Sequence, residues 1–499
     1  MSQRTESKPP DAKPIAGLVF VDLDGSLIAT DLLFELLFSL LRRSPWCLAL
    51  VPFWLLRGRA GLKAEVARRV MPEPEELPYN KALLELLGRR RAEGARLILA
   101  TASPRPWAEA VAGHLGLFEA VLATEPGRNL KGPGKLSAIR AYCQAIGEDR
   151  FDYVGDAEAD LPIWREAETA YVVGGGDGHG LTRRVKALGS SPTVHPVGPT
   201  ARVARSALRA LRPHQWAKNA LIFVPLLTSQ HLADPLALVS ATAAFVAFSL
   251  CASAIYVVND LVDLASDRAH PEKRGRPFAS GALPLASGPP MALGLLLGSF
   301  GLAAATLPAE FLVVLAGYLL LTTLYSLVIK SRLMVDVLAL ALLYSVRIFA
   351  GGIATAIPIS EWLIGFSTFF FLSLAFVKRY TELHRAIESG KLEKLRGRGY
   401  RPSDIGLVET LGATSGYLAV LVLALYIQSE AVRPLYRSPN WLWGICLVLV
   451  YWISRVWFLA KRGELPGDPV SFALRDRHSL ASGAIVALCL AAGAWLPWP

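Results

Sequence analysis

Two patterns of hydrophobic and polar positions divide the chain. In about the first two hundred residues, short apolar stretches alternate with polar ones, whereas long apolar runs recur from about Ala220 onward. A helix needs ~20 mostly apolar residues to cross a bilayer, so these runs predict membrane spans. The run near Leu226 is short and contains Pro225. Nine spans are predicted, centred near Leu226, Phe248, Leu296, Leu319, Leu342, Phe369, Val422, Leu449 and Val486.

The N-terminal pattern predicts an α/β domain. Three apolar stretches end in polar turns: IAGLVFVDLDGS, ARLILATAS and FDYVGDAEAD. Helical patterns lie between them, which is typical of a parallel sheet with crossover helices. The long insert over residues 32–90 is mostly helical, so we expect it to form a cap over the carboxyl edge of the sheet.

One apolar segment of this cap, Trp46–Leu56, is too short to span a bilayer. Arginines flank it on both sides, so it could lie in a membrane interface. The alternative, the buried face of a cap helix, is favoured at this stage. The flanking arginines are Arg42, Arg43, Arg57 and Arg59.

The predicted domain boundaries follow these patterns. Residues 1–14 are polar and contain prolines, which predicts a disordered tail. Residues 15–175 form the α/β domain, and residues 176–204 form a linker that includes the start of an interfacial helix. Residues 205–499 form an all-α polytopic membrane domain of about nine transmembrane helices.

Charge and composition narrow the function. Apolar residues make up 53% of the chain, the net charge is +11, and the five cysteines show no metal-ligand spacing. The basic residues cluster in alternate loops between the spans, which fits the positive-inside rule and argues against a nucleic-acid partner. We therefore expect an integral protein of the cytoplasmic (inner) membrane, with the soluble domain and the active sites on the cytoplasmic side.

Acidic and basic side chains in the α/β domain suit phosphoryl transfer. Asp22 and Asp24 end the first strand and can face the same way, because strand side chains alternate. One carboxylate can attack phosphorus, a second can act as acid and base, and Mg²⁺ can bridge carboxylates and phosphate. Hydroxyl and ammonium groups would hold the phosphate oxygens. The remaining candidates are Thr101, Lys135, Asp156 and Asp160.

The order of these motifs resembles the haloacid dehalogenase superfamily, most of whose members are phosphatases. The resemblance covers residues 15–175 and implies that Asp22 is the nucleophile and Asp24 the general acid and base. Thr101 and Lys135 would contact phosphate, and Mg²⁺ would be held by Asp22, Asp24, Asp156 and Asp160. Ser26 stands where threonine is commoner in the family, which keeps the hydroxyl.

A second acidic cluster ends the predicted span near Phe248. In NDLVDLASD, Asn259, Asp263 and Asp267 are four residues apart, so they share one helical face with Asp260 beside them. Carboxylates at membrane depth are costly and repel one another unless a cation lies between them. Mg²⁺ with a diphosphate is the occupant that oxygen ligands favour. The basic run that follows would hold more phosphate: Arg268, Lys273, Arg274 and Arg276.

This cluster resembles the UbiA superfamily of intramembrane prenyltransferases over residues 205–499. LRPHQWAKN and HPEKRGRPFASG are similar to the branch typified by decaprenyl-phosphate phosphoribosyltransferase, which uses phosphoribosyl diphosphate. Prenyl-diphosphate users carry a second Asp-rich motif, but the corresponding place here reads FVKRYTELHR. A cationic second site fits a lipid phosphate or a ribose 5-phosphate. Its predicted phosphate-binding residues are Lys218, Lys330, Arg347, Lys378 and Arg379.

The resemblance implies a bifunctional enzyme that acts in cell-wall lipid synthesis. With Mg²⁺ held by the acidic cluster, in which Asp260 and Asp263 are catalytic, a phosphoribosyl group would pass to a polyprenyl phosphate. The α/β domain would then remove a phosphate, expected to be the 5-phosphate of the lipid product. Three alternatives stay open: an aromatic prenyltransferase, a non-enzymatic lipid-binding or transport protein with a regulatory phosphatase, and a phosphatase with an unrelated soluble substrate. Oligomers are possible.

Overall fold

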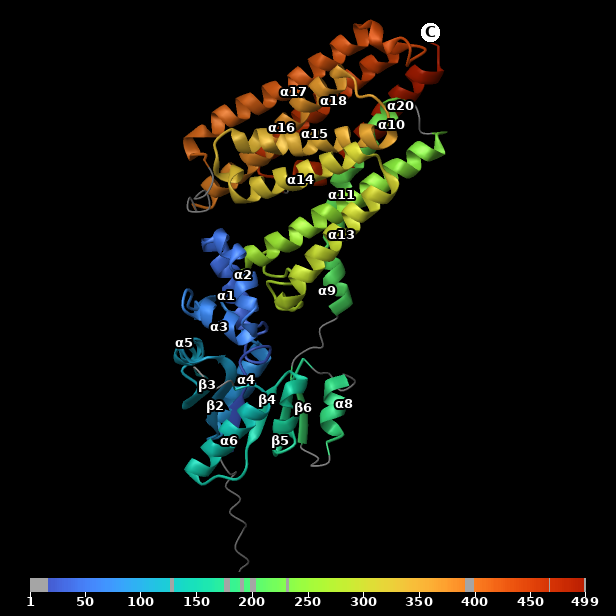
Figure 1. Cartoon of the computed structure of the whole chain (residues 1–499). Helices are drawn as coiled ribbons and strands as arrows, with labels where there is room; N and C mark the ends of the chain where they lie inside the picture. Colours follow the sequence, from blue (N-terminus) through green and yellow to red (C-terminus); the bar gives the residue numbers. More distant parts are fainter. Residues whose placement is uncertain are drawn as a thin grey trace, which may run out of the picture. The chain divides into compact units, whose positions relative to one another are not determined.

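The computed structural model describes residues 17–125, 130–174, 180–188, 193–197, 203–229, 233–390, 399–465 and 467–497. The predicted tail over residues 1–14 and parts of the predicted linker lie outside these ranges. The chain forms two compact units. The α/β unit comprises Met1–Ala210 and Val258–Pro290, and the helical unit comprises Leu211–Val257 and Met291–Pro499 (Figure 1).

The α/β unit is built on one six-stranded parallel sheet, as the sequence predicted. The strand order is β3-β2-β1-β4-β5-β6. Because β1 is central and every strand runs the same way, residues after β1 and β4 meet at the same edge. The strands are β1 (Leu18–Val21), β2 (Arg96–Pro104), β3 (Ala120–Thr124), β4 (Asp152–Gly155), β5 (Thr169–Val173) and β6 (Thr193–Val197).

Both faces of the sheet are covered by crossover helices. On one face Val21 and Leu99 pack with Trp107 of α5 (Arg105–Leu115). On the other face Phe20 packs with Ile139 of α6 (Pro133–Ile146). A strand that is buried on both faces needs apolar side chains at every position. This explains the continuous apolar sequence LVFV of β1. The remaining short helices of this part are η3 (Glu158–Asp160), α7 (Leu161–Trp164), α8 (Gly180–Lys186) and α9 (Val203–Ala210).

The sheet extends beyond residue 175, where the sequence predicted a linker. β6 pairs with β5 in parallel register, from Thr169 opposite Thr193 to Val173 opposite Val197. β6 is an edge strand whose side chains are largely exposed, so it lacks the apolar run of a central strand. This exposure explains why its sequence resembled a linker.

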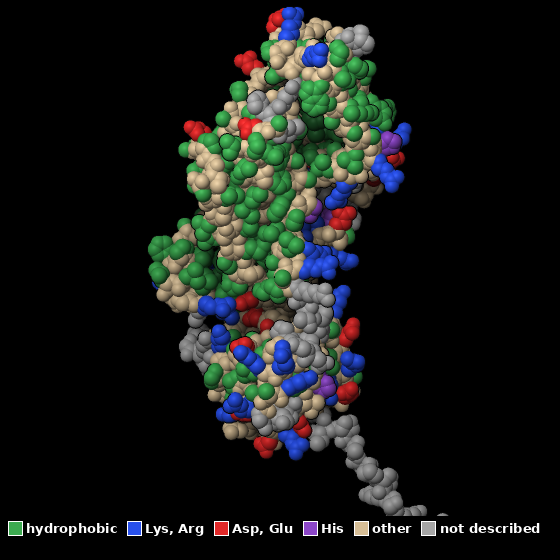
Figure 2. Space-filling view, turned by 90° about the vertical axis from the view of Figure 1, so that its right-hand side faces the viewer, with side chains coloured by type: hydrophobic (Ala, Val, Ile, Leu, Met, Phe, Trp, Pro, Cys, Tyr) green, Lys and Arg blue, Asp and Glu red, His purple; other side chains and the backbone are tan. Residues whose placement is uncertain are grey.

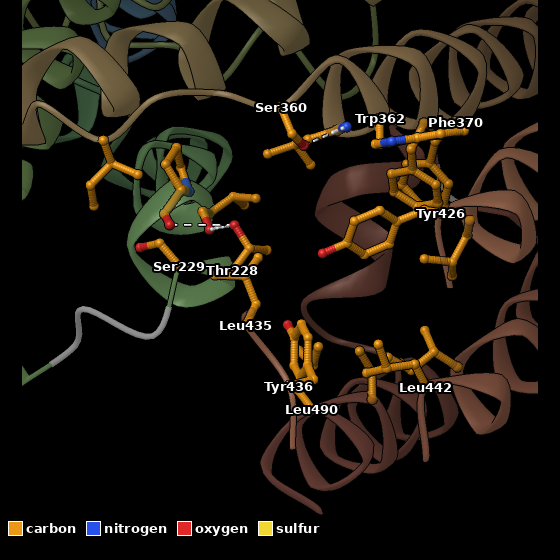
Figure 3. A pocket seen from close by; sticks show the side chains of 18 of the residues that line it. Thr228, Ser229, Ser360, Trp362, Phe370, Tyr426, Leu435, Tyr436, Leu442 and Leu490 are labelled. Carbon is orange, nitrogen blue, oxygen red and sulfur yellow. Dashed lines mark hydrogen bonds between the residues drawn. The ribbon is translucent and has the colours of Figure 1, made fainter. Parts of the chain in front are cut away.

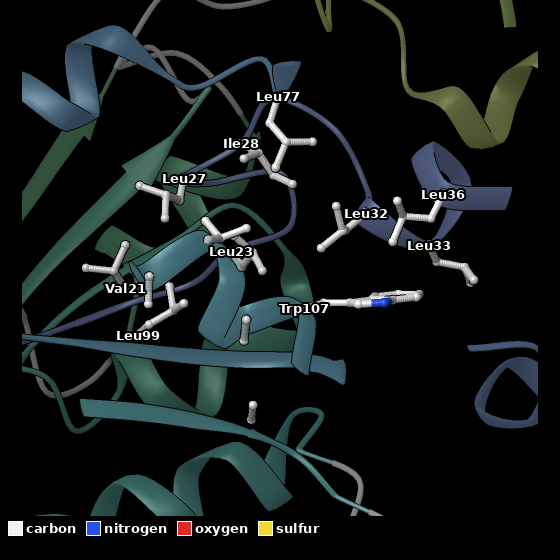
Figure 4. Packing of buried hydrophobic residues seen from close by; sticks show 14 of the residues in the cluster. Val21, Leu23, Leu27, Ile28, Leu32, Leu33, Leu36, Leu77, Leu99 and Trp107 are labelled. Atoms are coloured by element: carbon white, nitrogen blue, oxygen red, sulfur yellow. The ribbon is translucent and has the colours of Figure 1, made fainter. Parts of the chain in front are cut away.

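The insert between β1 and β2 is helical, as expected for a cap. Asp31 caps α1 by accepting a hydrogen bond from the Leu33 N–H. Figure 4 shows Leu32, Leu33 and Leu36 of α1 lying around Trp107, so the first cap helix packs on the sheet layer. The elements of the insert are α1 (Leu32–Arg43), η1 (Pro45–Ala49), α2 (Val51–Leu55), α3 (Gly58–Ala67), η2 (Pro74–Glu76) and α4 (Lys81–Ala92).

Residues 258–290, called here the acidic–basic segment, pack in the α/β unit. The segment contains α12 (Leu264–Ala269) and η6 (Leu285–Ser287). Gly281 has a positive φ of 75°, and a Cβ there would lie 2.5 Å from the Ala29 carbonyl oxygen. Only glycine permits this close approach without strain.

The helical unit contains helices long and apolar enough to cross a membrane. Eight candidate spans occur among the described residues. Figure 2 shows hydrophobic side chains over much of the visible face of this unit, as a lipid-facing surface requires. Its elements are η4 (Pro213–Phe223), α10 (Val224–Thr228), α11 (Pro235–Val262), α13 (Gly288–Thr306), α14 (Ala309–Leu327), η7 (Ile329–Ser331), α15 (Val335–Thr355), α16 (Glu361–Glu388), η9 (Pro402–Asp404), α17 (Ile405–Gln428), η10 (Glu430–Val432), η11 (Pro439–Leu442), α18 (Trp443–Lys461), α19 (Pro469–Ala473) and α20 (Arg477–Trp495).

The predicted ninth span, near Leu226, is not found in the described residues. This stretch forms the 3₁₀ helix η4 followed by the five-residue helix α10. Pro225 lies in the first turn of α10, where a missing N–H costs nothing. The segment is therefore too short and too irregular to cross a bilayer as one regular helix.

Candidate functional sites

Four predicted residues meet at the carboxyl edge of the sheet. Asp22 follows β1, Lys135 lies in the first turn of α6, and Asp160 ends η3. The Lys135 Nζ lies 3.0 Å from Asp22 Oδ2 and 3.3 Å from Asp160 Oδ1. The carboxylates of Asp22, Asp156 and Asp160 have ligand oxygens that all lie within 4.8 Å of one another.

Burial sets the protonation of this cluster. Burial raises the pKa of Asp22 to about 7, although Lys135 opposes the rise. Burial, together with Asp22 and Asp160, raises the pKa of Asp156 to about 8. The site therefore holds more negative charge than one lysine can balance, which favours an additional cation.

The donor set fits Mg²⁺. Asp160 Oδ2 is buried and has no hydrogen-bond partner among the described residues, although Asp160 Oδ1 is bonded. Three clustered carboxylates with such an open oxygen match the oxygen ligands that Mg²⁺ prefers. Asp22, Asp156 and Asp160 are the residues that would hold it. Asp24 is not part of this group.

Asp24 is instead held by its own partners, and its role as general acid and base stays a prediction. Its Oδ1 accepts the Leu32 N–H at 2.8 Å, and its Oδ2 accepts the Ser103 hydroxyl at 2.7 Å. Lys63 of the cap helix α3 lies 4.0 Å from the same Oδ2. The predicted phosphate contact Thr101 is fully buried and accepts the Ser103 N–H at 3.0 Å.

Sequence reasoning missed three residues of this site: Ser103, Lys63 and Tyr153. The Tyr153 hydroxyl donates to Asp160 Oδ1 at 2.9 Å and accepts from Lys135 at 2.9 Å. Ser103 follows Thr101 at the end of β2, so its position at the sheet edge was a usable signal. Lys63 carried no such signal, because the fold of the cap alone brings it to Asp24.

The second acidic cluster departs from the predicted single helical face. Helix α11 ends at Val262 and α12 begins at Leu264, with Asp263 as its N-cap. Asp260 and Asp267 are buried, and the Arg276 Nη1 bridges them at 3.1 Å and 2.6 Å. In the described part of the chain, Asp260, Asp263 and Asp267 do not form a metal-sized carboxylate group. A guanidinium thus lies between the two carboxylates where Mg²⁺ was expected.

The other predicted residues of this segment have different surroundings. Asn259 and Asp263 are partly exposed, and Lys273 and Arg274 are fully on the surface. Arg268 forms a two-oxygen ion pair with Glu35 of α1, at 2.6 Å and 2.9 Å. Its Nε also donates to the Ala279 carbonyl at 2.9 Å. Arg268 therefore fixes the acidic–basic segment to the cap, a contact that sequence spacing cannot reveal.

In the helical unit, the two buried arginines are occupied by internal partners. The Arg347 Nε donates to Asn219 Oδ1 at 2.8 Å, and its Nη2 donates to the Tyr318 hydroxyl at 3.1 Å. Arg379 forms ion pairs with Asp336 and Glu382. Arg347 has polar partners, as expected for an arginine inside an apolar helix. Both side chains pack helices together, so phosphate binding by either stays a prediction.

Lysines provide a more open cationic site in the helical unit. Lys218 of η4 lies 3.1 Å from Asp468 Oδ2, and Asp468 Oδ1 accepts the Tyr344 hydroxyl at 3.1 Å. Burial would raise the pKa of Asp468, but Lys218 and Lys378 together hold that pKa well below its usual range. Lys330, in η7, is partly exposed. Asp468 is a further missed residue; it was overlooked because it lies in a loop rich in basic residues and belongs to no acidic motif.

An apolar cavity lies elsewhere in the same unit. Its volume is about 650 Å³, and it is lined mainly by aromatic and aliphatic side chains from α10, α16, α17, α18 and α20. Figure 3 shows the Tyr426 and Tyr436 hydroxyls directed toward the open space. A helix rises ~1.5 Å per residue, so Phe370 in the cavity wall and Lys378 lie roughly 12 Å apart along α16. Volume and lining suit an elongated apolar ligand.

The fold and these sites define an integral membrane enzyme with two domains. The chain belongs to the UbiA prenyltransferase family, whose model matches residues 220–480, and a haloacid dehalogenase-like hydrolase model matches residues 19–165. It therefore joins a UbiA-type transferase domain to a haloacid dehalogenase-like phosphatase domain, and the prediction of a non-enzymatic protein is set aside.

Similar proteins cover both the whole chain and its C-terminal part. The uncharacterized protein y4nM of Sinorhizobium fredii is 37% identical over 474 residues, covering 93% of this chain and 89% of that protein. Nodulation protein NoeC of Azorhizobium caulinodans is 38% identical over 275 residues, covering 54% and 87%. Decaprenyl-phosphate phosphoribosyltransferase of Mycobacterium tuberculosis is 33% identical over 296 residues, covering 56% and 91%. A solved UbiA homologue from Archaeoglobus fulgidus, bound to DMAPP and Mg²⁺, is 17% identical over 58% of this chain and 97% of its own, with a TM-score of 0.43.

Magnesium should stabilise the α/β unit in a pH-dependent way. The expected gain is about 2.7 kcal/mol at a Mg²⁺ concentration one hundred times the Kd, measured by thermal unfolding at pH 8. The gain should shrink at pH 6, because the pKa of Asp22 is about 7 and protons then compete for the carboxylates. With EDTA present, the Asp22 contribution to stability should fall as pH rises from its ordinary pKa of 3.8 to about 7, since the unfolded chain releases its proton first.

Asp160→Asn should lose most of the Mg²⁺ effect, whereas Asp149→Asn, at an exposed position, should keep it. An equal gain in the wild type and in Asp160→Asn would place the ion elsewhere.

The Arg268–Glu35 ion pair should hold the acidic–basic segment against the cap. Glu35→Arg and Arg268→Glu should each speed hydrogen exchange in residues 264–287, and the double exchange should restore most of the protection. The expected coupling is roughly 1.5–3 kcal/mol, because charged hydrogen bonds that are largely removed from water contribute about that much. The exposed Arg43–Glu73 pair, treated in the same way, should couple by less than about 1 kcal/mol. If the effects of the two single substitutions on hydrogen exchange simply add in the double variant, the Arg268–Glu35 ion pair does not hold the segment.

Proposed function

We propose that the membrane domain transfers a 5-phosphoribosyl group from phosphoribosyl diphosphate to a polyprenyl phosphate. The observation that carries this proposal is the 33% identity to decaprenyl-phosphate phosphoribosyltransferase over 91% of that protein's length. The cationic FVKRYTELHR segment, which replaces a second Asp-rich motif, supports the same choice. A polyprenyl acceptor also suits the apolar cavity of the helical unit.

The chemistry needs charge neutralisation more than proton transfer. The bond from ribose C1 to the diphosphate breaks, the diphosphate leaves with the electron pair, and a phosphate oxygen of the lipid forms the new C1–O bond. Because the acceptor phosphate is already ionised at neutral pH, no strong general base is required. Bound Mg²⁺ would neutralise the leaving diphosphate. Asn259, Asp260, Asp263 and Asp267 are the proposed ligands in this domain.

Arg276 has a particular place in this scheme. It now balances the buried charges of Asp260 and Asp267. Arginine binds phosphate in a forked geometry, so a bound diphosphate offers it an equivalent partner. Arg276 would exchange carboxylate for phosphate when substrate and metal arrive. Arg268, Lys273 and Arg274 would hold further phosphate charge.

The helical unit would bind the remaining anions through its lysines. Lys218 and Lys378 share the environment of Asp468, and Lys330 lies in η7, just after α14. Arg347 and Arg379, which already have internal partners, would support these lysines by holding the helices in place. A phosphate that displaces Asp468 from Lys218 would keep that ammonium group paired.

The phosphatase domain would act on the product of this transfer. Asp22 would attack the 5-phosphate, and Asp24 would give a proton to the departing ribose oxygen. Asp24 would then take a proton from the water that hydrolyses the aspartyl phosphate. The Ser103 and Leu32 contacts hold Asp24 ready for both steps. We place both sites on the cytoplasmic side of the cytoplasmic membrane, because the basic loops should face inward.

Lipid analysis with three proteins tests this proposal. Full-length protein in nanodiscs, supplied with Mg²⁺, phosphoribosyl diphosphate and decaprenyl phosphate, should yield decaprenyl-phosphoryl ribose by mass spectrometry. Asp22→Asn should accumulate the lipid that keeps its 5-phosphate, since the nucleophile is lost. Asp260→Asn should form neither lipid above about 1% of the wild-type rate, because losing one charge-stabilising group costs ~10²–10³ in rate.

The same assay separates the competing functions. Transfer from geranylgeranyl diphosphate to an aromatic acid, without use of phosphoribosyl diphosphate, would identify an aromatic prenyltransferase instead. If Asp22→Asn and the wild type release the same 5-phosphorylated lipid, the phosphatase acts on another substrate while the transferase assignment stands.

A further inference from the structure

A group of large apolar side chains is exposed on the cap of the phosphatase domain. Five of them lie between residues 46 and 56 and are 49–84% exposed. Among described residues 17–197, Met71 is the only other large hydrophobic side chain exposed to this degree. The cap patch, as we call this group, consists of Trp46, Leu48, Phe53, Leu55 and Leu56.

The expectation that this segment is the buried face of a cap helix is therefore wrong for most of its residues. Cys47 and Trp54 are buried, and Leu50 and Val51 pack partly against the same core. The Arg69 guanidinium lies 4.8 Å from the Trp54 ring centroid. These contacts fix η1 and α2, so the outward side chains are presented on folded turns. Several large apolar side chains exposed within eleven residues exceed the singly scattered ones that are normal on a protein surface, so they indicate an interaction site.

The charge around the cap patch indicates the partner. Residues 42–69 contain seven basic side chains and one acidic one, Glu65. Arg57, Arg59 and Arg68 are all strongly exposed, although each also contacts a carboxylate. Aromatic and aliphatic tips within a basic rim match the boundary between acyl chains and anionic headgroups. Tryptophan in particular favours that boundary.

We propose that the cap patch inserts into the surface of an anionic bilayer. The same chain carries eight candidate membrane spans among its described residues, so the protein is held at a bilayer. The insertion gives the cap a second role, because α3 follows the patch directly and carries Lys63, which lies beside Asp24. A cap seated on lipid thus brings the site around Asp24 close to a substrate whose phosphate emerges from the membrane, without changing the contacts inside that site. The proposal that the cap inserts into lipid is argued from the exposure of its apolar side chains and from the surrounding charge. The further proposal that its substrate is carried by a lipid rests on the proposed function.

Spin labels on the full-length protein in nanodiscs test the docking directly. Leu56→Cys and, as a matched control, Met71→Cys are labelled in a Cys489→Ala background, because the other four cysteines are buried. In nanodiscs with anionic lipid, the label at 56 should be relaxed by oxygen, which concentrates in lipid, and shielded from aqueous nickel chelate. The label at 71 should show the reverse. If the label at 56 is shielded from both oxygen and nickel chelate, protein covers the patch. If both reagents reach the label, the patch faces water. Either result overturns the proposal.

Activity provides the second measurement. Trp46→Ser, Phe53→Ser and Leu56→Ser combined should lower hydrolysis of a phosphate monoester anchored in anionic vesicles roughly tenfold or more, since even one buried side chain of this size accounts for about a decade in partition. Hydrolysis of soluble p-nitrophenyl phosphate should stay unchanged, which also shows that the variant folds. Met71→Ser should change neither rate. An equal loss on both substrates would assign the patch a structural role. If the labels show insertion into lipid but the patch variant hydrolyses the anchored ester as fast as the wild type, the docking of the cap stands. The proposal that the phosphatase acts on a lipid-borne substrate is then rejected.

Discussion

A buried carboxylate must be matched by a cation, and this constraint shapes both acidic sites of the α/β unit. Lys135 lies between Asp22 and Asp160, and Arg276 lies between Asp260 and Asp267. Removing one partner from such a pair leaves an uncompensated charge that costs several kcal/mol. Each site therefore has a resting state in which a single basic residue balances two acids.

The two pairings differ in how much charge they leave for other ions. At the sheet edge Asp156 joins the group, and one lysine cannot balance three carboxylates; the raised pKa values of Asp22 and Asp156 express the excess. Around Arg276 the balance is closer, because only two buried acids meet it. The sheet edge thus keeps an excess of negative charge that a metal ion could balance, whereas little excess charge is left around Arg276.

Most of the fold, and the residues that meet at the sheet edge, could be predicted from the sequence for specific reasons. Asp22, Asp156 and Lys135 follow strands or begin a helix, and the parallel topology brings such positions to one edge. The Arg268–Glu35 contact could not be predicted, since it joins residues far apart in the sequence with no shared spacing. The exposure of the cap patch was not predicted for a related reason. An apolar pattern shows that residues favour burial, but it does not show whether the protein's own core or another partner covers them.

These observations explain why two chemistries gain from sharing one chain. If the transferase product stays on a polyprenyl anchor, as proposed above, it diffuses only within the membrane, and a phosphatase that acts on it must itself stay at the membrane surface. The acidic–basic segment belongs by its packing to the α/β unit although its sequence lies between two spans. The cap of the phosphatase therefore contacts the part of the chain that carries the transferase acids. The Arg268–Glu35 ion pair therefore joins the cap to the stretch of chain in which Asp267 directly precedes Arg268.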